Sequence, residues 1–348
     1  MTDEQWDRLV SVIDGQVLDP LPVGFIIDSP WLPGWAGIST MDYFTSDLKW
    51  LDANLKVVRS FPDIMFLPGF WAEHGMCTEP SAFGTKCRWA ENELPFAEKI
   101  IARIEDIDSL EKPNPRTDGL LPFVVSRLRN NRERIEDSGH RIRFAVARGP
   151  LNVATFLMGT TEFLMAVRTH PAEIARLLTV VTDFLVDWLR FQRETFDSID
   201  GLLILDDIVG FLGEEDFREA ALPYLKRVFG SLEVAVRLFH NDSSGVVCAP
   251  FLGEIGVNLF NFSFEHSLVE MKELTNNTVT LLGNIPPRDV LADGTPDDVG
   301  ESLDSALEQV VDRSHLVLSC GGGMPGGVPT ENIEAFLNAV RARGSRSV

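Results

Sequence analysis

Residues 201–207 read GLLILDD, a run of five apolar or small residues that ends in two carboxylates. A short apolar run without strict alternation is typical of a parallel strand that is buried on both faces. Seven further runs share this pattern: PVGFIID (22–28), DIMFLPG (63–69), RFAVARG (143–149), VAVRLFHND (234–242), VNLFNFS (257–263), VTLLGNI (279–285) and LVLSCGG (316–322). We therefore expect eight parallel strands.

Segments with a helical apolar stripe separate most of these runs. The segment 171–196 begins with Pro171, a residue favoured in the first turn of a helix. The segment 214–233 contains Pro223, which should kink the helix or divide it in two. The segment 295–311 opens with a Thr cap and an acidic first turn. Two further helices are expected at 267–276 and 329–344.

The alternation of strands and helices predicts one α/β domain over residues 1–348, a (β/α)₈ TIM barrel. An open doubly wound sheet is the alternative, but no GxGxxG turn follows the first strand. Residues 1–16 are expected to form an N-terminal amphipathic helix. Residues 70–142 are expected to be a helical insertion between strands two and three, with helices at 94–107 and 119–137 covering the barrel mouth.

The composition indicates which kinds of binding partner, and which cellular compartment, suit this chain. The formal net charge of -21 disfavours binding to nucleic acid or to an anionic membrane surface. A small neutral substrate, or a neutral or basic protein partner, fits this charge better. Four cysteines without a CxxC pair suit a reducing compartment, and no signal peptide or bilayer-spanning apolar run is recognisable. We expect a cytoplasmic protein.

Polar residues at the strand ends are the candidates for chemistry, because a (β/α)₈ barrel collects its reacting groups there. They are Asp28, Glu73, His74, Arg148, Asp206, Asp207, His240, Asp242, Asn261, Asn284 and Cys320. His240 and Asp242 are two apart on a strand, so their side chains face the same way. Cys320 ends the eighth strand, across the same mouth. Imidazole, carboxylate and thiolate together predict a zinc site whose fourth position is left for substrate. A hydrogen-bonded His–Asp pair and a cysteine packed in the core are the alternatives.

Two other pairs of ionisable residues lie at strand ends. Asp206 and Asp207 follow GLLIL and must be partly desolvated, so we expect them to position substrate, act as an acid, or cap the next helix. Glu73 and His74 lie in GFWAEHGM among glycines and aromatics. They are expected to contact substrate or, through Glu73, to supply a fourth metal ligand, with loop hydrogen bonds as the alternative. Arg148 is expected to neutralise Asp206 or Asp207.

From about residue 20 to 342 the chain resembles the uroporphyrinogen decarboxylase superfamily, which includes decarboxylases and zinc-dependent corrinoid methyltransferases. The segments that carry the resemblance are RGPLNVATFLMGTTEFL (148–164), LILDDIVGFLGEEDFREAALPYLKRV (203–228), LFHNDSSG (238–245), LLGNIPPRDVLADGTPDDV (281–299) and LSCGGGMPGGVPTENIEAFLNAVR (318–341). The fold implied is again the (β/α)₈ barrel. The true decarboxylases bind an eight-carboxylate substrate through an arginine-rich N-terminal motif. Residues 22–44 of this chain contain no arginine or lysine, which disfavours tetrapyrrole decarboxylation.

The methyltransferase branch is the more similar one. Its coenzyme M-type members hold zinc with a His-x-Cys pair and a later Cys, which implies His240, Asp242 and Cys320 as the metal ligands here. Asp242 departs from the expected cysteine. A carboxylate in place of a thiolate makes zinc a harder Lewis acid, better matched to the oxygen of a methyl ether than to a thiol.

The resemblance therefore implies methyl transfer from a small substrate, an aryl methyl ether being favoured, to cob(I)alamin. No corrinoid-binding DxHxxG motif occurs, so the cobalamin is expected on a separate corrinoid protein. Relatives imply a homodimer. A metal-free decarboxylase of a porphyrinogen-like or smaller acid, a methylcobalamin:thiol methyltransferase, and a barrel that binds a ligand without turnover are the alternatives.

Overall fold

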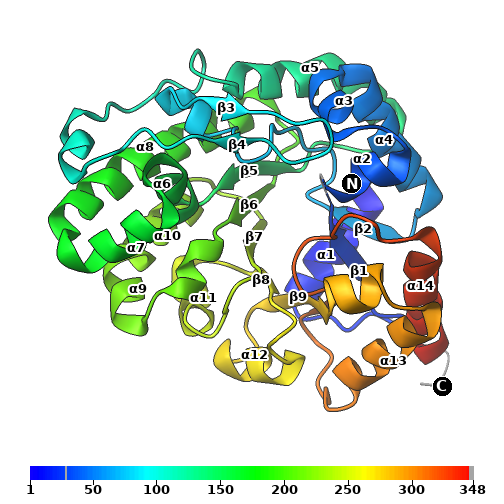
Figure 1. The fold of residues 1–348 in the computed structure, drawn as a ribbon. Coiled ribbons are helices and arrows are strands. Elements are labelled where there is room, and N and C mark those ends of the chain that lie inside the picture. Colours follow the sequence, from blue (N-terminus) through cyan, green and yellow to red (C-terminus); the bar gives the residue numbers. More distant parts are fainter. Residues whose placement is uncertain (28–29, 345–348) are drawn as a thin grey trace.

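A computed structural model describes residues 1–27 and 30–344, so Asp28 lies outside the described residues. Eight parallel strands form one sheet in the order β2-β1-β10-β9-β8-β7-β6-β5, which curls into a (β/α)₈ barrel (Figure 1). They are β1 (Val23–Ile26), β2 (Ile64–Leu67), β5 (Phe144–Arg148), β6 (Gly201–Leu205), β7 (Val236–Asn241), β8 (Leu259–Phe262), β9 (Thr280–Ile285) and β10 (Leu316–Cys320). All eight expected strands are confirmed. In the described ranges β2 and β5 are the two edges of the sheet, with no ladder joining them.

Alternation along each strand divides the core into two layers. One set of side chains faces the barrel axis and the other packs against the surrounding helices, as in other parallel barrels. The inner layer includes Phe144, Val146, Leu203, Leu238, Leu282 and Val317. The N-terminal helix α1 (Asp3–Ile13), expected from the sequence, adds Trp6, Leu9 and Val12 to the same layer. Trp6 meets the ring of Phe144, at the start of β5, edge to face at 5.5 Å, so α1 covers the N-terminal end of the barrel.

Helices surround the sheet, and those expected at 171–196, 267–276, 295–311 and 329–344 are confirmed. The surrounding helices are α2 (Trp31–Ala36), α3 (Thr40–Thr45), α4 (Asp47–Ser60), α5 (Leu121–Asp137), α6 (Pro150–Met158), α7 (Thr160–Thr169), α8 (Pro171–Thr195), α9 (Glu214–Ala220), α10 (Leu222–Phe229), α11 (Leu252–Ile255), α12 (Leu268–Leu274), α13 (Pro296–Leu307) and α14 (Thr330–Gly344). The predicted effect of Pro223 is confirmed, because α9 ends and α10 begins just before it. Thr295 caps α13 by accepting a hydrogen bond from the backbone N–H of Asp298.

The insertion between β2 and β5 differs in part from expectation. Its second expected helix is confirmed as α5, but the helix expected at 94–107 is wrong. That stretch instead holds β4 (Phe96–Ala97), which pairs with β3 (Cys87–Arg88), and the start of the 3₁₀ helix Ile104–Ser109. The backbone N–H groups of Ile100 and Ile101 both donate to the carbonyl of Leu157 in α6. Hydrogen bonds to a distant element have replaced those of a local helix.

Among the helices of the described ranges, none by itself is both long and apolar enough to cross a membrane. The consecutive helices α6 and α7, which meet at a bend of 108°, reach that length and apolar content only when taken together.

Candidate metal centre

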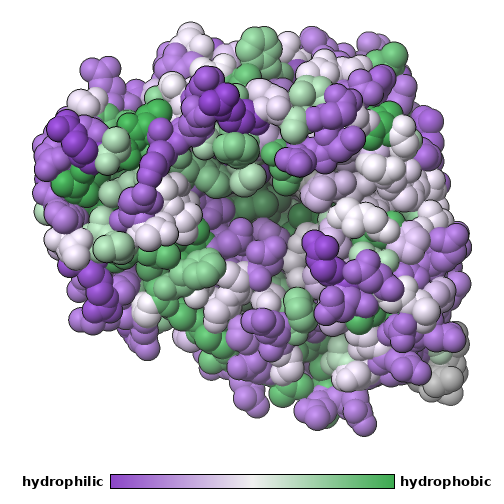
Figure 2. Space-filling view, in the orientation of Figure 1, coloured by the Kyte–Doolittle hydropathy of each residue, from purple (hydrophilic) through white to green (hydrophobic). Residues whose placement is uncertain are grey.

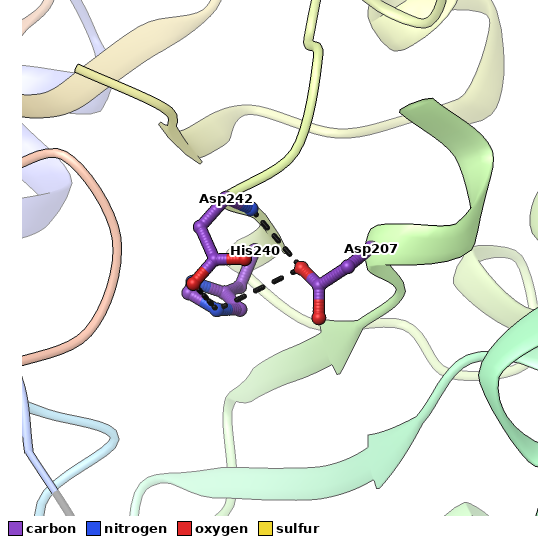
Figure 3. Close-up of side chains that lie close together, drawn as sticks. All are labelled: Asp207, His240 and Asp242. Atoms are coloured by element: carbon purple, nitrogen blue, oxygen red, sulfur yellow. Dashed lines mark hydrogen bonds and ion pairs between the residues drawn. The ribbon is translucent and has the colours of Figure 1, made fainter. Parts of the chain in front are cut away.

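Three ionisable side chains converge where β6 and β7 end (Figure 3). Asp207 opens the 3₁₀ helix Asp207–Phe211 directly after β6, while His240 lies in β7 and Asp242 just beyond it. The Nε2 atom of His240 lies 4.0 Å from Oδ1 of Asp207 and 3.8 Å from Oδ2 of Asp242. The backbone N–H of Asp242 donates to Oδ1 of Asp207 at 3.0 Å, which holds the Asp207 carboxylate against the main chain of Asp242. The three potential ligand atoms all lie within 4.8 Å of one another.

The His240 ring is held in one orientation by Asn261, on the neighbouring strand β8. Nδ1 of His240 lies 2.7 Å from Oδ1 of Asn261. The Asn261 amide nitrogen donates to the carbonyls of Leu282 and Cys320, at 2.8 and 3.3 Å. Because these two bonds fix the amide nitrogen as the donor, its oxygen must accept, and Nδ1 of His240 must carry the proton. The lone pair of the neutral ring is then on Nε2, which faces the two carboxylates.

The electrostatics of the cluster favour a cation. Burial raises the pKa of Asp207 to about 6, with His240 acting in the opposite direction and Asp242 adding to the rise by repulsion. His240 is buried, whereas the side chains of Asp207 and Asp242 remain 36% and 49% exposed. Two crowded carboxylates beside an imidazole lone pair are stabilised by a divalent cation, and partial exposure leaves a route for it to enter.

One imidazole and two carboxylates fit a catalytic zinc site. Zinc accepts nitrogen and carboxylate oxygen donors, and catalytic sites use three protein ligands with one open position. The expected pairing of His240 with Asp242 is present. Asp207, in contrast, was expected only to position substrate, act as an acid or cap the next helix. Its place beside Asp242 follows from the register of β6 against β7, in which Leu205 is opposite His240. That register could not be read from the sequence.

Cys320 is not one of the three members of this cluster. Its side chain is fully buried in the outer layer, with Leu316 and Leu318 of the same strand. The thiol contacts the carbonyl of Gly322 at 3.4 Å, and burial raises its pKa to about 12. The glycines after Cys320 do admit a close neighbour: a Cβ at Gly322 would lie 3.1 Å from Cβ of Asp242.

Asp206 is fully buried against the start of α6. Its carboxylate accepts hydrogen bonds from the backbone N–H groups of Leu151 and Asn152, at 2.8 and 3.0 Å, in the first turn of α6. Gly149 makes room for it, because a Cβ there would lie 2.3 Å from an Asp206 oxygen. Full burial raises the pKa of Asp206 well above its ordinary value. The expectation that it caps the next helix is therefore wrong: Asp206 makes no side-chain cap hydrogen bond to the 3₁₀ helix Asp207–Phe211, and its carboxylate accepts instead from the first turn of the preceding helix α6.

Glu73 and Arg148 form a buried ion pair beside β5. Nη1 of Arg148 lies 2.9 Å from Glu73 and 3.6 Å from a second buried carboxylate, Glu79. Glu79 was not predicted as a site residue, because it lies within the insertion and not at a predicted strand end. Arg148 therefore neutralises these two glutamates, and the expectation that it pairs with Asp206 or Asp207 is wrong. His74 faces another way and packs against the rings of Phe44 and Trp89, each at 6.1 Å. Burial and the nearby Arg127 lower the pKa of His74 to about 4.

Comparison with known proteins agrees with this architecture. Residues 4–343 match the family model described as Uroporphyrinogen decarboxylase (URO-D). A uroporphyrinogen decarboxylase of Psychromonas ingrahamii is 24% identical over 276 residues, which are 76% of this chain and 75% of that protein. A methyltransferase structure from Methanosarcina mazei superposes with a TM-score of 0.81 at 18% identity, covering 97% of this chain and 98% of the other. A B12-independent methionine synthase from Shewanella superposes with a TM-score of 0.57 at 12% identity, covering 95% and 98%.

Proposed function

Because this chain belongs to the uroporphyrinogen decarboxylase family, we propose that it is a zinc-dependent methyltransferase. It would move a methyl group from a small methylated substrate, an aryl methyl ether being the favoured class, to the cob(I)alamin of a separate corrinoid protein. The observation that carries the proposal is the convergence of Asp207, His240 and Asp242 at the C-terminal end of the strands, where barrel enzymes place their chemistry.

The side chains around the centre have separate tasks in this proposal. Asn261 keeps the His240 lone pair on Nε2, available to the metal. His240 and Asp242 hold the zinc, with a third ligand from Asp207 or Cys320. Bound zinc supplies a Lewis acid that stabilises the oxygen as the methyl group leaves it. Asp206 is a positioning residue, because it holds the turn between β6 and the 3₁₀ helix against α6.

Decarboxylation of a polycarboxylate is the second activity found in the family, and the mouth is poorly suited to it. Such a substrate needs cationic partners for each carboxylate. Arg148 already faces two carboxylates of the protein, Glu73 and Glu79, and the N-terminal stretch 22–44 offers no arginine or lysine. Asp207 and Asp242 add negative charge at the mouth. These features favour an uncharged or weakly charged substrate.

A docking surface for a protein partner is supported by the exposed aromatic side chains. The exposed Phe and Trp residues of the described chain are Trp89, Phe96, Phe123, Phe211 and Phe264. All of them lie in segments that follow the C-terminal ends of strands or begin the next helix. Figure 2 shows apolar surface beside the central hollow of the molecule. Exposed apolar groups around a hollow are typical of protein interfaces.

The metal requirement can be tested before any substrate is known. The purified full-length chain should contain about one zinc per chain. A chelator should remove it, and readdition should restore binding of one equivalent. A chain that takes up no metal at a defined stoichiometry would contradict the proposal and leave the metal-free decarboxylase as the better hypothesis.

A further inference from the structure

We infer that the metal centre contains no thiolate: Asp207, His240 and Asp242 supply the protein ligands, and Cys320 lies outside the coordination sphere. The inference rests on the proposed function only in taking the barrel mouth as a metal site. It differs from the ligand set that the family resemblance implies, in which Cys320 and not Asp207 is the third ligand. The identity of this third ligand affects which class of substrate the metal would favour.

The direction of the Cys320 side chain carries the first step. Side chains on a strand alternate between the two faces of the sheet. Val317 lies in the inner layer of the barrel, whereas Leu316, Leu318 and Cys320 lie in the outer layer. The residue of β10 that shares the inner face with Val317 is therefore Ser319. On β7, Val236 and Leu238 are inner residues, so His240 also faces inward. The imidazole and the thiol thus leave their strands toward opposite faces.

The contacts of Cys320 agree with this placement. Its side chain is fully buried, and the thiol contacts the carbonyl of Gly322 at 3.4 Å. Bringing sulfur to the His240 side of the sheet would require β10 to change its register or its twist near Cys320. Such a change would also disturb the paired residues of β9.

Asp207 occupies the place that a third ligand needs. Its Oδ1 lies 4.0 Å from Nε2 of His240 and accepts the backbone N–H of Asp242 at 3.0 Å. This hydrogen bond fixes the Asp207 carboxylate against the residue that supplies the other oxygen donor. The arrangement needs only small side-chain adjustments to close on one ion.

The donor set then selects the chemistry. One nitrogen and two oxygens form a harder site than one that includes sulfur. The ion keeps more of its positive charge and prefers oxygen partners. We infer that the substrate class is one that presents an oxygen at the reacting centre, such as a methyl ether, and that thiols are poor partners.

Cobalt(II) substitution of the full-length chain tests the ligand set without reference to turnover. A thiolate ligand gives cobalt(II) an intense near-ultraviolet charge-transfer band, which carboxylates and imidazole do not give. We expect no such band in the wild-type chain or in Cys320→Ser. Cys248→Ser is the matched control, because Cys248 is likewise fully buried, with its thiol 3.3 Å from the carbonyl of Gly245. Asp207→Asn should lower the affinity for cobalt(II) by at least about tenfold, and Cys320→Ser should leave it unchanged.

X-ray absorption of the zinc-loaded wild type provides a check that needs no variant, and only nitrogen and oxygen neighbours are expected. A sulfur neighbour, or a charge-transfer band lost in Cys320→Ser but kept in Cys248→Ser, would overturn the inference. Unchanged affinity in a folded Asp207→Asn chain would also overturn it. If the ligand set is as inferred but no methyl transfer is found, the proposed function fails and the inference stands.

Discussion

Nδ1 of His240 lies 2.7 Å from Oδ1 of Asn261, and the Asn261 amide nitrogen is occupied by two main-chain carbonyls. These three contacts connect β7, β8, β9 and β10 at the level of the metal centre. They fix which ring nitrogen of His240 is free, so the metal site is prepared by the main chain of the barrel and not by the ligands alone. Partners of this kind are as important to metal sites as the ligands themselves.

Replacing Asn261 should therefore weaken metal binding. Asn261→Ala leaves the His240 ring free to rotate and to change tautomer, and we expect about a 10- to 100-fold loss of zinc affinity, measured by chelator competition. Asn258→Ala is the control, because Asn258 makes comparable main-chain hydrogen bonds, to Arg237 and Ala235, at the other end of the barrel. Equal affinities for the two variants would show that Asn261 does not orient the ligand.

Asp207 should make the metal-free protein less stable as the pH rises. Burial raises its pKa from 3.8 to about 6, so the folded chain binds this proton more tightly than the unfolded chain. The stabilisation from the proton is full below the unfolded pKa and is lost as the pH rises through about 6. After discounting for solvent screening, Asp207→Asn should raise the stability of the metal-free chain at neutral pH by about 1 kcal/mol. Denaturant unfolding at several pH values measures this. A variant that is less stable than the wild type at neutral pH, or that keeps its pH dependence, would contradict the assignment.

Asp206 and Asp207 are adjacent in sequence, but replacing them should have opposite effects on the free energy of unfolding and different effects on zinc affinity. Asp206→Ala removes two hydrogen bonds at the start of α6 and leaves buried N–H groups without partners. We expect a loss of about 2 kcal/mol in the free energy of unfolding, with zinc affinity retained. Denaturant titration and chelator competition on the same preparations separate the two effects. Loss of zinc binding in a folded Asp206→Ala chain would place Asp206 in the metal centre after all.

The exposed aromatic side chains near the mouth should affect the binding of the partner protein and not the binding of zinc. Phe211→Ser and Phe264→Ser each remove an exposed apolar side chain next to a strand end. We expect a loss of about fivefold or more in affinity for a corrinoid protein, measured by calorimetry, with no change in zinc content. Val311→Ser is the control, because Val311 is 97% exposed but lies in the loop before β10, at the opposite end of the barrel. Equal effects at both ends would argue against docking at the mouth.

The strands were predictable because parallel strands buried on both faces leave continuous apolar runs such as GLLIL (201–205), and the split at Pro223 followed from proline geometry. The helix expected at 94–107 was not formed, because Ile100 and Ile101 hydrogen-bond to Leu157, a contact that depends on how α6 packs. The pairing of His240 with Asp242 followed from their spacing. The place of Asp207 beside Asp242 could be predicted only by knowing the register of β6 against β7. The contacts of Asp206 could be predicted only by knowing the position of α6, which begins 56 residues earlier in the chain. Contacts of that kind are properties of tertiary structure.

Transfer of a methyl group is the central claim, and its direct test is an assay with cob(I)alamin and a panel of aryl methyl ethers. The zinc-loaded chain should form methylcobalamin and the corresponding phenol in equal amounts. The metal-depleted chain and Asp242→Ala, which lacks one of the proposed ligands, should form neither above background. Methylcobalamin formed equally well without metal, or release of CO₂ from a carboxylic acid by the metal-free chain, would contradict the account.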